Sequence, residues 1–253
     1  MSSLIAASVI LACMLVGLML GSLFRRKLPD HHTKDDSRDT IKTATGTLAT
    51  LVALIIGLLV SSAKSSFDAV SATITQSGAK IITLDRVLLR YGPETKPLRE
   101  QLSRSVTGGI ELIWPEDGRG KADVAGYEKG QGMEELCEQI RSLTPKNESQ
   151  QFLKAQAQQL SFDLIQARWL PIEQSQNTLP PLFLAVLVFW LTVLYACFGL
   201  LAPRNVTAYL ALAICALSMA GAVFLIMELN RPMDGTIKVS SAPLVKALTL
   251  INH

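Results

Sequence analysis

The residues best suited to metal chemistry lie in one short polar segment. The sequence HHTKDD brings His31, His32, Asp35 and Asp36 within six residues. On a helical turn, His32 and Asp36 would be four positions apart and would face the same metal ion. Protein metal sites use three or four ligands, and further residues hold these ligands in place through hydrogen bonds. The neighbouring sequence supplies no such supporting residues. We therefore interpret the segment as a solvated loop and expect no metal and no other cofactor.

Sequence signatures of catalysis are absent from the chain. It has no P-loop, no HExxH zinc motif, no GxSxG turn and no glycine-rich dinucleotide-binding turn. Three of its four cysteines, Cys13, Cys197 and Cys215, lie in apolar segments, where a thiol behaves as a small apolar group. Cys137 is then left without an obvious partner, which disfavours a disulfide framework. These features indicate a protein that is not an enzyme.

Composition and hydropathy point to a membrane. Only 18% of the 253 residues are charged and 49% are hydrophobic, whereas about a quarter of a typical soluble domain is charged. Four segments have the roughly 20 mostly apolar residues that cross a bilayer, namely 4–24, 43–63, 181–202 and 207–227. The net charge of +3 is too small to indicate a nucleic-acid partner. We predict a multi-pass protein of the plasma (inner) membrane, with the lipid bilayer as its partner.

The order of these segments predicts an all-α polytopic membrane protein. Residues 1–63 form one transmembrane hairpin and residues 179–230 a second one, followed by a C-terminal tail at 231–253. Between the hairpins, residues 64–178 show helical patterns and no strand-like cluster, which predicts a helical extramembrane bundle. Glycines and mixed charges over residues 115–132 indicate a mobile loop.

An apolar stripe continues from the second span into the polar region. Phe67, Ile74, Ile81 and Leu88 recur every seven residues. Other apolar residues of the same face are Val70, Leu84 and Tyr91. Span two and this stripe therefore predict one helix of about 50 residues, roughly 70 Å long and twice the bilayer core.

Two further helices are predicted in the polar region. Residues 96–114 place apolar side chains along one side of a helix. A second helix is expected to start at Thr144 and Pro145, with the threonine as its cap and the proline in its first turn, and to run past Trp169.

Span two carries a stripe of small and hydroxyl-bearing residues. The residues share one helical face, with spacings of three or four, and they are Gly46, Thr50, Ala53, Gly57, Ser61 and Lys64. One interpretation is close helix packing, because small residues let backbones approach in lipid. The other is a pore lining, in which symmetry-related copies present hydroxyls and a ring of Lys64 favours anions. For Lys64 alone, another interpretation is a residue that flanks the span and extends its ammonium group to the membrane interface. We predict these six residues as pore-lining.

Three features of the sequence resemble those of a known protein family. They are LPDHHTKDDSRDTIKTATGTLATLVALIIGLLVSSAKSSFD at 28–68, IWPEDG at 113–118, and the late pair of spans. On these segments the chain resembles the bestrophin-like membrane proteins of bacteria, over nearly its whole length. The resemblance implies a homopentamer in which helices line an axial pore that extends beyond the membrane. It also implies conduction of inorganic anions such as chloride.

Three functional classes stay open at this point. The first is an ion channel. The second is a non-conducting membrane scaffold or sensor whose helical region binds a protein partner. The third is a small-molecule transporter, which the lack of acidic or histidine residues within the spans disfavours. The orientation is also open, because Arg25, Arg26 and Lys27 favour a cytoplasmic first loop, whereas the bestrophin resemblance places residues 64–178 in the cytoplasm.

Overall fold

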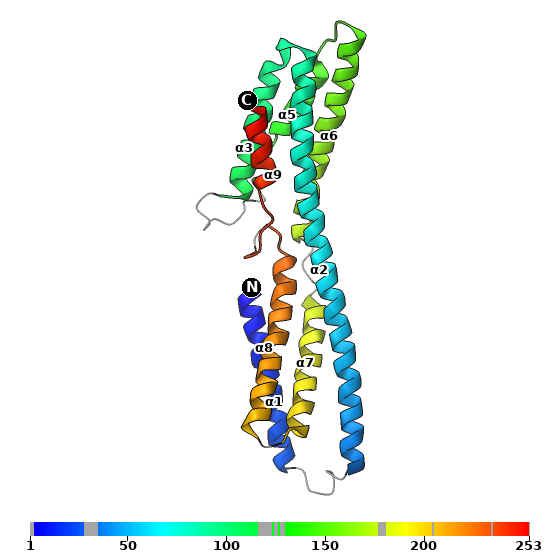
Figure 1. The fold of residues 1–253 in the computed structure, drawn as a ribbon, viewed down its shortest axis with the longest axis vertical. Helices are drawn as coiled ribbons and strands as arrows, with labels where there is room; N and C mark the ends of the chain where they lie inside the picture. The colour runs from blue at the N-terminus through cyan, green and yellow to red at the C-terminus, as the bar shows by residue number, and fades with distance from the viewer. Residues whose placement is uncertain are drawn as a thin grey trace. The chain divides into compact units, whose positions relative to one another are not determined.

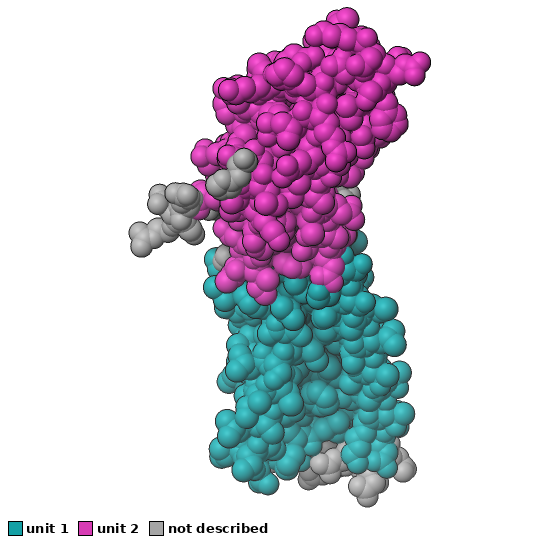
Figure 2. All heavy atoms as spheres, turned by 45° about the horizontal axis from the view of Figure 1, so that its top comes forward, with its two compact units in different colours: residues 1–65, 178–230 teal, residues 66–177, 231–253 magenta. Residues whose placement is uncertain are grey.

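The chain folds into two compact units, coloured teal and magenta in Figure 2. Unit 1 comprises Met1–Ser65 and Thr178–Asn230, and unit 2 comprises Ser66–Asn177 and Arg231–His253. The computed structural model describes residues 3–27, 35–115, 123, 126, 130–176, 181–203, 205–233 and 235–252. Within these ranges, the side chains of residues 26, 27, 35–38, 170–176 and 181 are not described.

All regular elements within the described ranges are helices (Figure 1). In chain order they are α1 (Ser3–Lys27), α2 (Asp35–Tyr91), the 3-10 helix η2 (Pro93–Thr95), α3 (Lys96–Ile113), α5 (Gly132–Ser142), α6 (Glu148–Gln176), α7 (Pro181–Leu201), α8 (Val206–Leu229) and α9 (Ala242–Ile251). The predicted all-α class is thus confirmed for the part of the chain that the structure describes. The four predicted spans coincide with α1, part of α2, α7 and α8, which are long and apolar enough to cross a membrane.

Helix α2 is a single helix of 57 residues. The prediction that span two and the heptad stripe form one helix is therefore confirmed. The border between the two units falls inside this helix, after Ser65. Beyond the border the stripe is used as predicted, because Ile74, Ile81 and Leu88 are buried and Phe67 is partly buried.

Unit 2 is a helical bundle with two hydrophobic clusters. The larger cluster joins α2, α3, α5, α6 and α9, and its residues Leu84, Leu102, Leu136 and Ala247 are fully buried. The smaller cluster consists of Val70, Ile74, Ile113, Met233 and Val239. The indole nitrogen of Trp114 fixes this second cluster by donating a hydrogen bond to the carbonyl of Val239 at 2.8 Å.

Two helices of unit 2 were not foreseen in the sequence. Helix α5 begins at Gly132, where the sequence predicts the end of a mobile loop. Residues 116–122, 124, 125 and 127–129 of that loop lie outside the described residues. Helix α9 lies in the segment expected to be a tail, and its Ile251 is buried in the larger cluster. Gly78 of α2 permits its approach, since a Cβ there would lie 2.8 Å from the carbonyl oxygen of Pro243.

The predicted start of α6 is wrong by a few residues. The helix begins at Glu148 and not at Thr144 and Pro145. Asn147 is the capping residue, because its side-chain oxygen accepts a hydrogen bond from the Gln150 amide at 2.8 Å. The Gln150 side chain in turn accepts a hydrogen bond from the Lys146 amide at 2.8 Å. This reciprocal arrangement satisfies two amides and resembles a capping box.

In unit 1, helix α1 lies beside α7 and α8 (Figure 1). The Ser22 hydroxyl of α1 lies 2.8 Å from the Tyr209 hydroxyl of α8. Arg25, near the end of α1, donates a hydrogen bond to the carbonyl of Ala202, just after α7. A cation at this position complements the partial negative charge of the helix C-terminus.

Helices α2 and α3 are joined by a buried ion pair between Asp85 and Arg99. The Arg99 guanidinium donates two hydrogen bonds, from Nε to Asp85 Oδ1 at 2.6 Å and from Nη2 to Oδ2 at 3.1 Å. The Asp85 side chain is only 3% exposed. We expect Arg99→Leu to lower the free energy of unfolding by about 3 kcal/mol, because the buried carboxylate loses its partner.

The matched control for this pair is the contact between Lys146 and Glu94, which is 3.8 Å long and exposed. Lys146→Leu should change the free energy of unfolding by less than about 0.5 kcal/mol. Chemical denaturation of the full chain in detergent micelles measures both variants. Equal effects of the two substitutions would contradict the importance of the buried pair.

Lys80 of α2 binds Asp163 of α6, with Nζ 2.8 Å from Oδ2. This hydrogen bond, aided by a second one from Gln159, lowers the pKa of Asp163 below its usual value of 3.8. The pair therefore stabilises unit 2 above that pH, and its contribution is lost as the pH falls below 3.8 and the carboxyl group takes up a proton. We expect Asp163→Asn to be less stable than the wild type at neutral pH. The difference in unfolding midpoint should shrink progressively as the pH is lowered below 3.8, and a difference that acid leaves unchanged would contradict the assignment.

Candidate functional site

The six residues predicted to line a pore share one face of α2 within unit 1. Gly46, Thr50, Ala53, Gly57, Ser61 and Lys64 are all exposed. We call this face the small-residue stripe. The buried face of the same segment consists of Thr45, Val52, Ile56 and Ala63. At 3.6 residues per turn the two faces are about 120° apart. Unit 1 therefore uses one face of α2 for its own packing and leaves the stripe uncovered.

The stripe differs in chemistry from the large apolar side chains that unit 1 exposes elsewhere. Helices α1, α7 and α8 expose large apolar side chains, including Leu4, Phe24, Phe189, Leu210 and Leu217. Helix α2 also exposes Leu51, Leu54 and Leu58 on the face next to the stripe. Large apolar side chains suit contact with lipid acyl chains. Glycine, alanine and hydroxyl-bearing residues suit close backbone contact or water.

Two threonine hydroxyls on or beside the stripe are hydrogen-bonded within α2. Thr50 Oγ1 donates to the carbonyl of Gly46 at 2.9 Å, and Thr47 donates to Thr43 at 3.0 Å. These hydroxyls therefore present oxygen lone pairs outward, which attract cations and water more than anions. Lys64 is the one cationic member of the stripe, and Asp68 follows at a spacing where opposite charges interact on a helix. A preference for anions would depend on Lys64.

Glycines of α1 and α7 lie where these two helices touch. A Cβ at Gly17 would come within 2.5 Å of the Thr192 carbonyl oxygen. A Cβ at Gly21 would collide with the carbonyl of Ala196, and one at Gly199 would collide with the carbonyl of Leu18. The contact is reciprocal, so each helix provides glycine against the backbone of the other. Gly17 and Gly21 form a GxxxG motif, a signal for close helix packing that the sequence analysis missed.

Gly46 and Gly57 of the stripe have no such role. A Cβ at either position would meet no atom within 4 Å. Of the two sequence-based interpretations, close packing within the chain thus applies to α1 and α7. At Gly46 and Gly57 the stripe makes no such close contact within the described part of the chain.

A separate apolar groove of about 390 Å³ lies between α2 and α7. It is lined by Ile55, Leu58, Leu59 and Ser62 of α2, and by Phe183, Val186, Leu187 and Trp190 of α7. The α2 residues of the groove occupy faces of the helix other than the small-residue stripe. The groove is therefore distinct from the candidate site.

Of the four residues that were considered as metal ligands and interpreted as part of a solvated loop, only two lie within the described residues. His31 and His32 lie outside the described residues, and Asp35 and Asp36 begin α2 without described side chains. Among the residues that the structure does describe, no three His, Cys, Asp or Glu residues are grouped so that they could hold a metal ion. The four cysteines, Cys13, Cys137, Cys197 and Cys215, are free thiols.

Comparison with known families supports the resemblance noted in the sequence. A family model described as a bestrophin-like domain matches residues 5–244, nearly the entire chain. No curated protein and no solved structure shows significant similarity to the chain.

We expect the substitution of glycine by alanine to affect the free energy of unfolding differently at the contact between α1 and α7 and in the small-residue stripe. Gly21→Ala should lower the free energy of unfolding by about 1–3 kcal/mol, because the new methyl group overpacks the contact between α1 and α7. Gly57→Ala should leave it unchanged or raise it by up to about 1 kcal/mol, because alanine favours helix and meets no atom. Thermal unfolding of the purified protein in detergent measures both. Destabilisation by Gly57→Ala equal to that by Gly21→Ala would mean that the stripe is packed in the isolated chain.

Proposed function

We propose, from the premise that this chain belongs to the bestrophin-like family, that copies of it assemble into an anion channel with α2 at the axis. Family membership supports a membrane protein of the bestrophin-like type. The observation that carries the pore assignment is the small-residue stripe, whose six members are all exposed on one face of α2. These small and polar residues suit lipid less than the large apolar side chains that α1, α7 and α8 expose.

The proposed assembly is a closed ring with rotational symmetry, and the family resemblance favours a homopentamer. In a ring, each copy turns the same face of α2 towards the axis, so the stripe of every copy would border one path. Glycine, alanine and serine would keep that path wide enough for water. The apolar surfaces of α1, α7 and α8 would then face lipid.

Ion preference in this proposal comes from a ring of Lys64. Thr50 and Thr47 already donate their hydroxyl protons to the backbone, so these two residues offer no donor to an anion. A ring of ammonium groups at the polar end of the stripe would raise the local concentration of chloride. Asp68 would moderate this field, because it follows one turn later on the same helix.

Cysteine accessibility tests whether the stripe faces water. In a chain with its four native cysteines changed to alanine, Thr50→Cys and Ser61→Cys are compared with Leu54→Cys. A membrane-impermeant thiosulfonate reacts with the thiolate, which forms readily only in contact with water. We expect the two stripe positions to react at least about tenfold faster than Leu54→Cys. Equal rates, or a faster reaction at Leu54→Cys, would mean that the stripe faces lipid and would overturn the pore assignment.

Flux measurements test conduction and the role of Lys64. Purified protein in liposomes is subjected to chloride and potassium gradients, and native mass spectrometry counts the chains in each assembly. We expect chloride flux in the wild type, a loss of chloride preference in Lys64→Glu, and blocked flux in Gly57→Leu. Gly221→Leu is the control, because Gly221 in α8 also has open space at its Cβ position. A monomeric protein, or an intact ring without flux, would contradict a channel.

An intact ring without flux would favour the scaffold or sensor. One observation supports that alternative: α6 in unit 2 exposes Phe152, Phe162 and Trp169. Exposed aromatic side chains are common at protein interfaces. The scaffold would then bind its partner protein through α6.

A further inference from the structure

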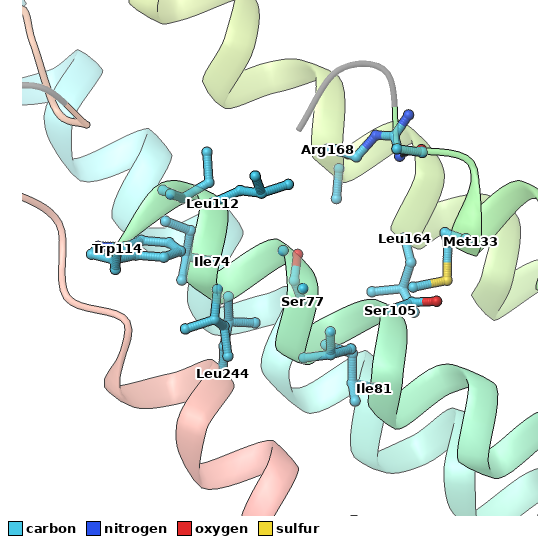
Figure 3. A pocket seen from close by; sticks show the side chains of 18 of the residues that line it. Ile74, Ser77, Ile81, Ser105, Leu112, Trp114, Met133, Leu164, Arg168 and Leu244 are labelled. Atoms are coloured by element: carbon cyan, nitrogen blue, oxygen red, sulfur yellow. Dashed lines mark hydrogen bonds between the residues drawn. The ribbon is translucent and has the colours of Figure 1, made fainter. Parts of the chain in front are cut away.

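Unit 2 contains a cavity of about 280 Å³ bordered by α2, α3, α6 and the start of α5 (Figure 3). Its walls are mainly apolar. In the close-up, Ser77 lies near the middle, with Ile74 and Trp114 on one side and Ser105 and Leu164 on the other. The volume is close to the lower limit of small-molecule sites, about 300 Å³. The cavity therefore suits only a compact organic ligand with an apolar body, smaller than a drug-sized molecule.

The hydroxyl groups of the cavity differ in what they can offer a ligand. Thr73 and Ser77 of α2 donate their protons to the carbonyls of Ala69 and Thr73, at 2.9 and 2.8 Å. Ser105 of α3 lines the same cavity. Its hydroxyl has no hydrogen-bond partner within the described part of the chain. Ser105 is therefore a donor that a ligand could use.

Two arginines contribute positive charge to the cavity wall. Arg168 of α6 is already compensated, because its Nη2 lies 2.7 Å from Glu134 Oε1 and its side chain is only 10% exposed. Arg104 of α3 is exposed and lines the cavity, which places it at the opening, and it forms no ion pair with any described residue. No Asp or Glu is among the described residues that line the cavity. The polar end of the cavity therefore has an excess of positive charge.

We propose that this cavity binds a monocarboxylate with a medium-length aliphatic chain. The chain occupies the apolar wall near Ile74, Ile110 and Leu164, and the carboxylate lies between Ser105 and Arg104. A carboxylate matches the planar fork of a guanidinium group through two parallel hydrogen bonds. A doubly charged phosphate would need more compensation than one unpaired arginine provides, and a cation would be repelled. The site lies entirely within unit 2 and does not depend on conduction.

The binding test uses full-length protein in lipid nanodiscs and tritiated octanoate, with binding to empty nanodiscs subtracted. We expect saturable binding with one site per chain. Unlabelled octanoate should displace the label, and acetate, which lacks the chain, should not. Octanol and octyltrimethylammonium should compete at least about tenfold more weakly than octanoate, because they lack the carboxylate that Arg104 and Ser105 bind.

Matched variants locate the site. Arg104→Gln should weaken octanoate binding about tenfold. Arg86→Gln should leave it unchanged, because Arg86 is exposed on α2 and does not line the cavity. Gly108→Leu should abolish binding, because Gly108 lines the cavity and a Cβ there meets no atom within 4 Å. Thr107→Leu adds similar bulk at an exposed position outside the cavity and should bind normally.

Three results would overturn the proposal. The first is an absence of saturable binding above that of empty nanodiscs. The second is equal competition by octanol together with unchanged binding by Arg104→Gln, which would leave an apolar void without a carboxylate site. The third is normal binding by a folded Gly108→Leu, verified by circular dichroism, which would place octanoate elsewhere. If Gly108→Leu does not fold, the competitor series and Arg104→Gln still decide the outcome.

Discussion

Hydrogen bonding of the backbone within each helix is the constraint on which unit 1 depends. A chain surrounded by lipid finds no water for its amides and carbonyls, so each spanning segment must satisfy them itself. Helix α2 does so without interruption from Asp35 to Tyr91. Where a helix ends, its last carbonyls lack a backbone donor, and a side chain can supply the hydrogen bond, as Arg25 does for the carbonyl of Ala202. The hydroxyl of Thr50 is also satisfied within the chain, because it donates to the carbonyl of Gly46 in its own helix.

Small residues serve two separate purposes in unit 1. Gly17, Gly21 and Gly199 let the backbones of α1 and α7 come into contact, and any Cβ there would collide. Gly46 and Gly57 lie in open space and do nothing for the packing of a single chain. Composition alone makes the two sets look alike, since both follow helical spacing. Their difference in surroundings is the reason that the proposed pore assignment rests on the stripe on α2 and not on the motif on α1.

Unit 2 combines an apolar core with ion pairs that join its helices. Asp85 and Arg99 connect α2 to α3, and Lys80 and Asp163 connect α2 to α6. Arg168 is compensated by Glu134, so most of the buried or partly buried charge in the bundle has a partner. Arg104 is exposed and forms no ion pair with any described residue, and it lies at the opening of a cavity that the core does not fill.

The sequence by itself determined the helical class, the four helices that are long and apolar enough to cross a membrane, and the continuity of α2. These follow from local periodicity and from the absence of proline in α2, which short-range backbone geometry translates directly into structure. It also placed the six stripe residues on one helical face, because their spacing matches the helical period. Only the tertiary structure decided which glycines meet another backbone, that α5 and α9 complete the core of unit 2, and that Ser105 and Arg104 border a cavity. Those features depend on contacts between residues far apart in the chain, and the pattern along a single segment does not carry that information.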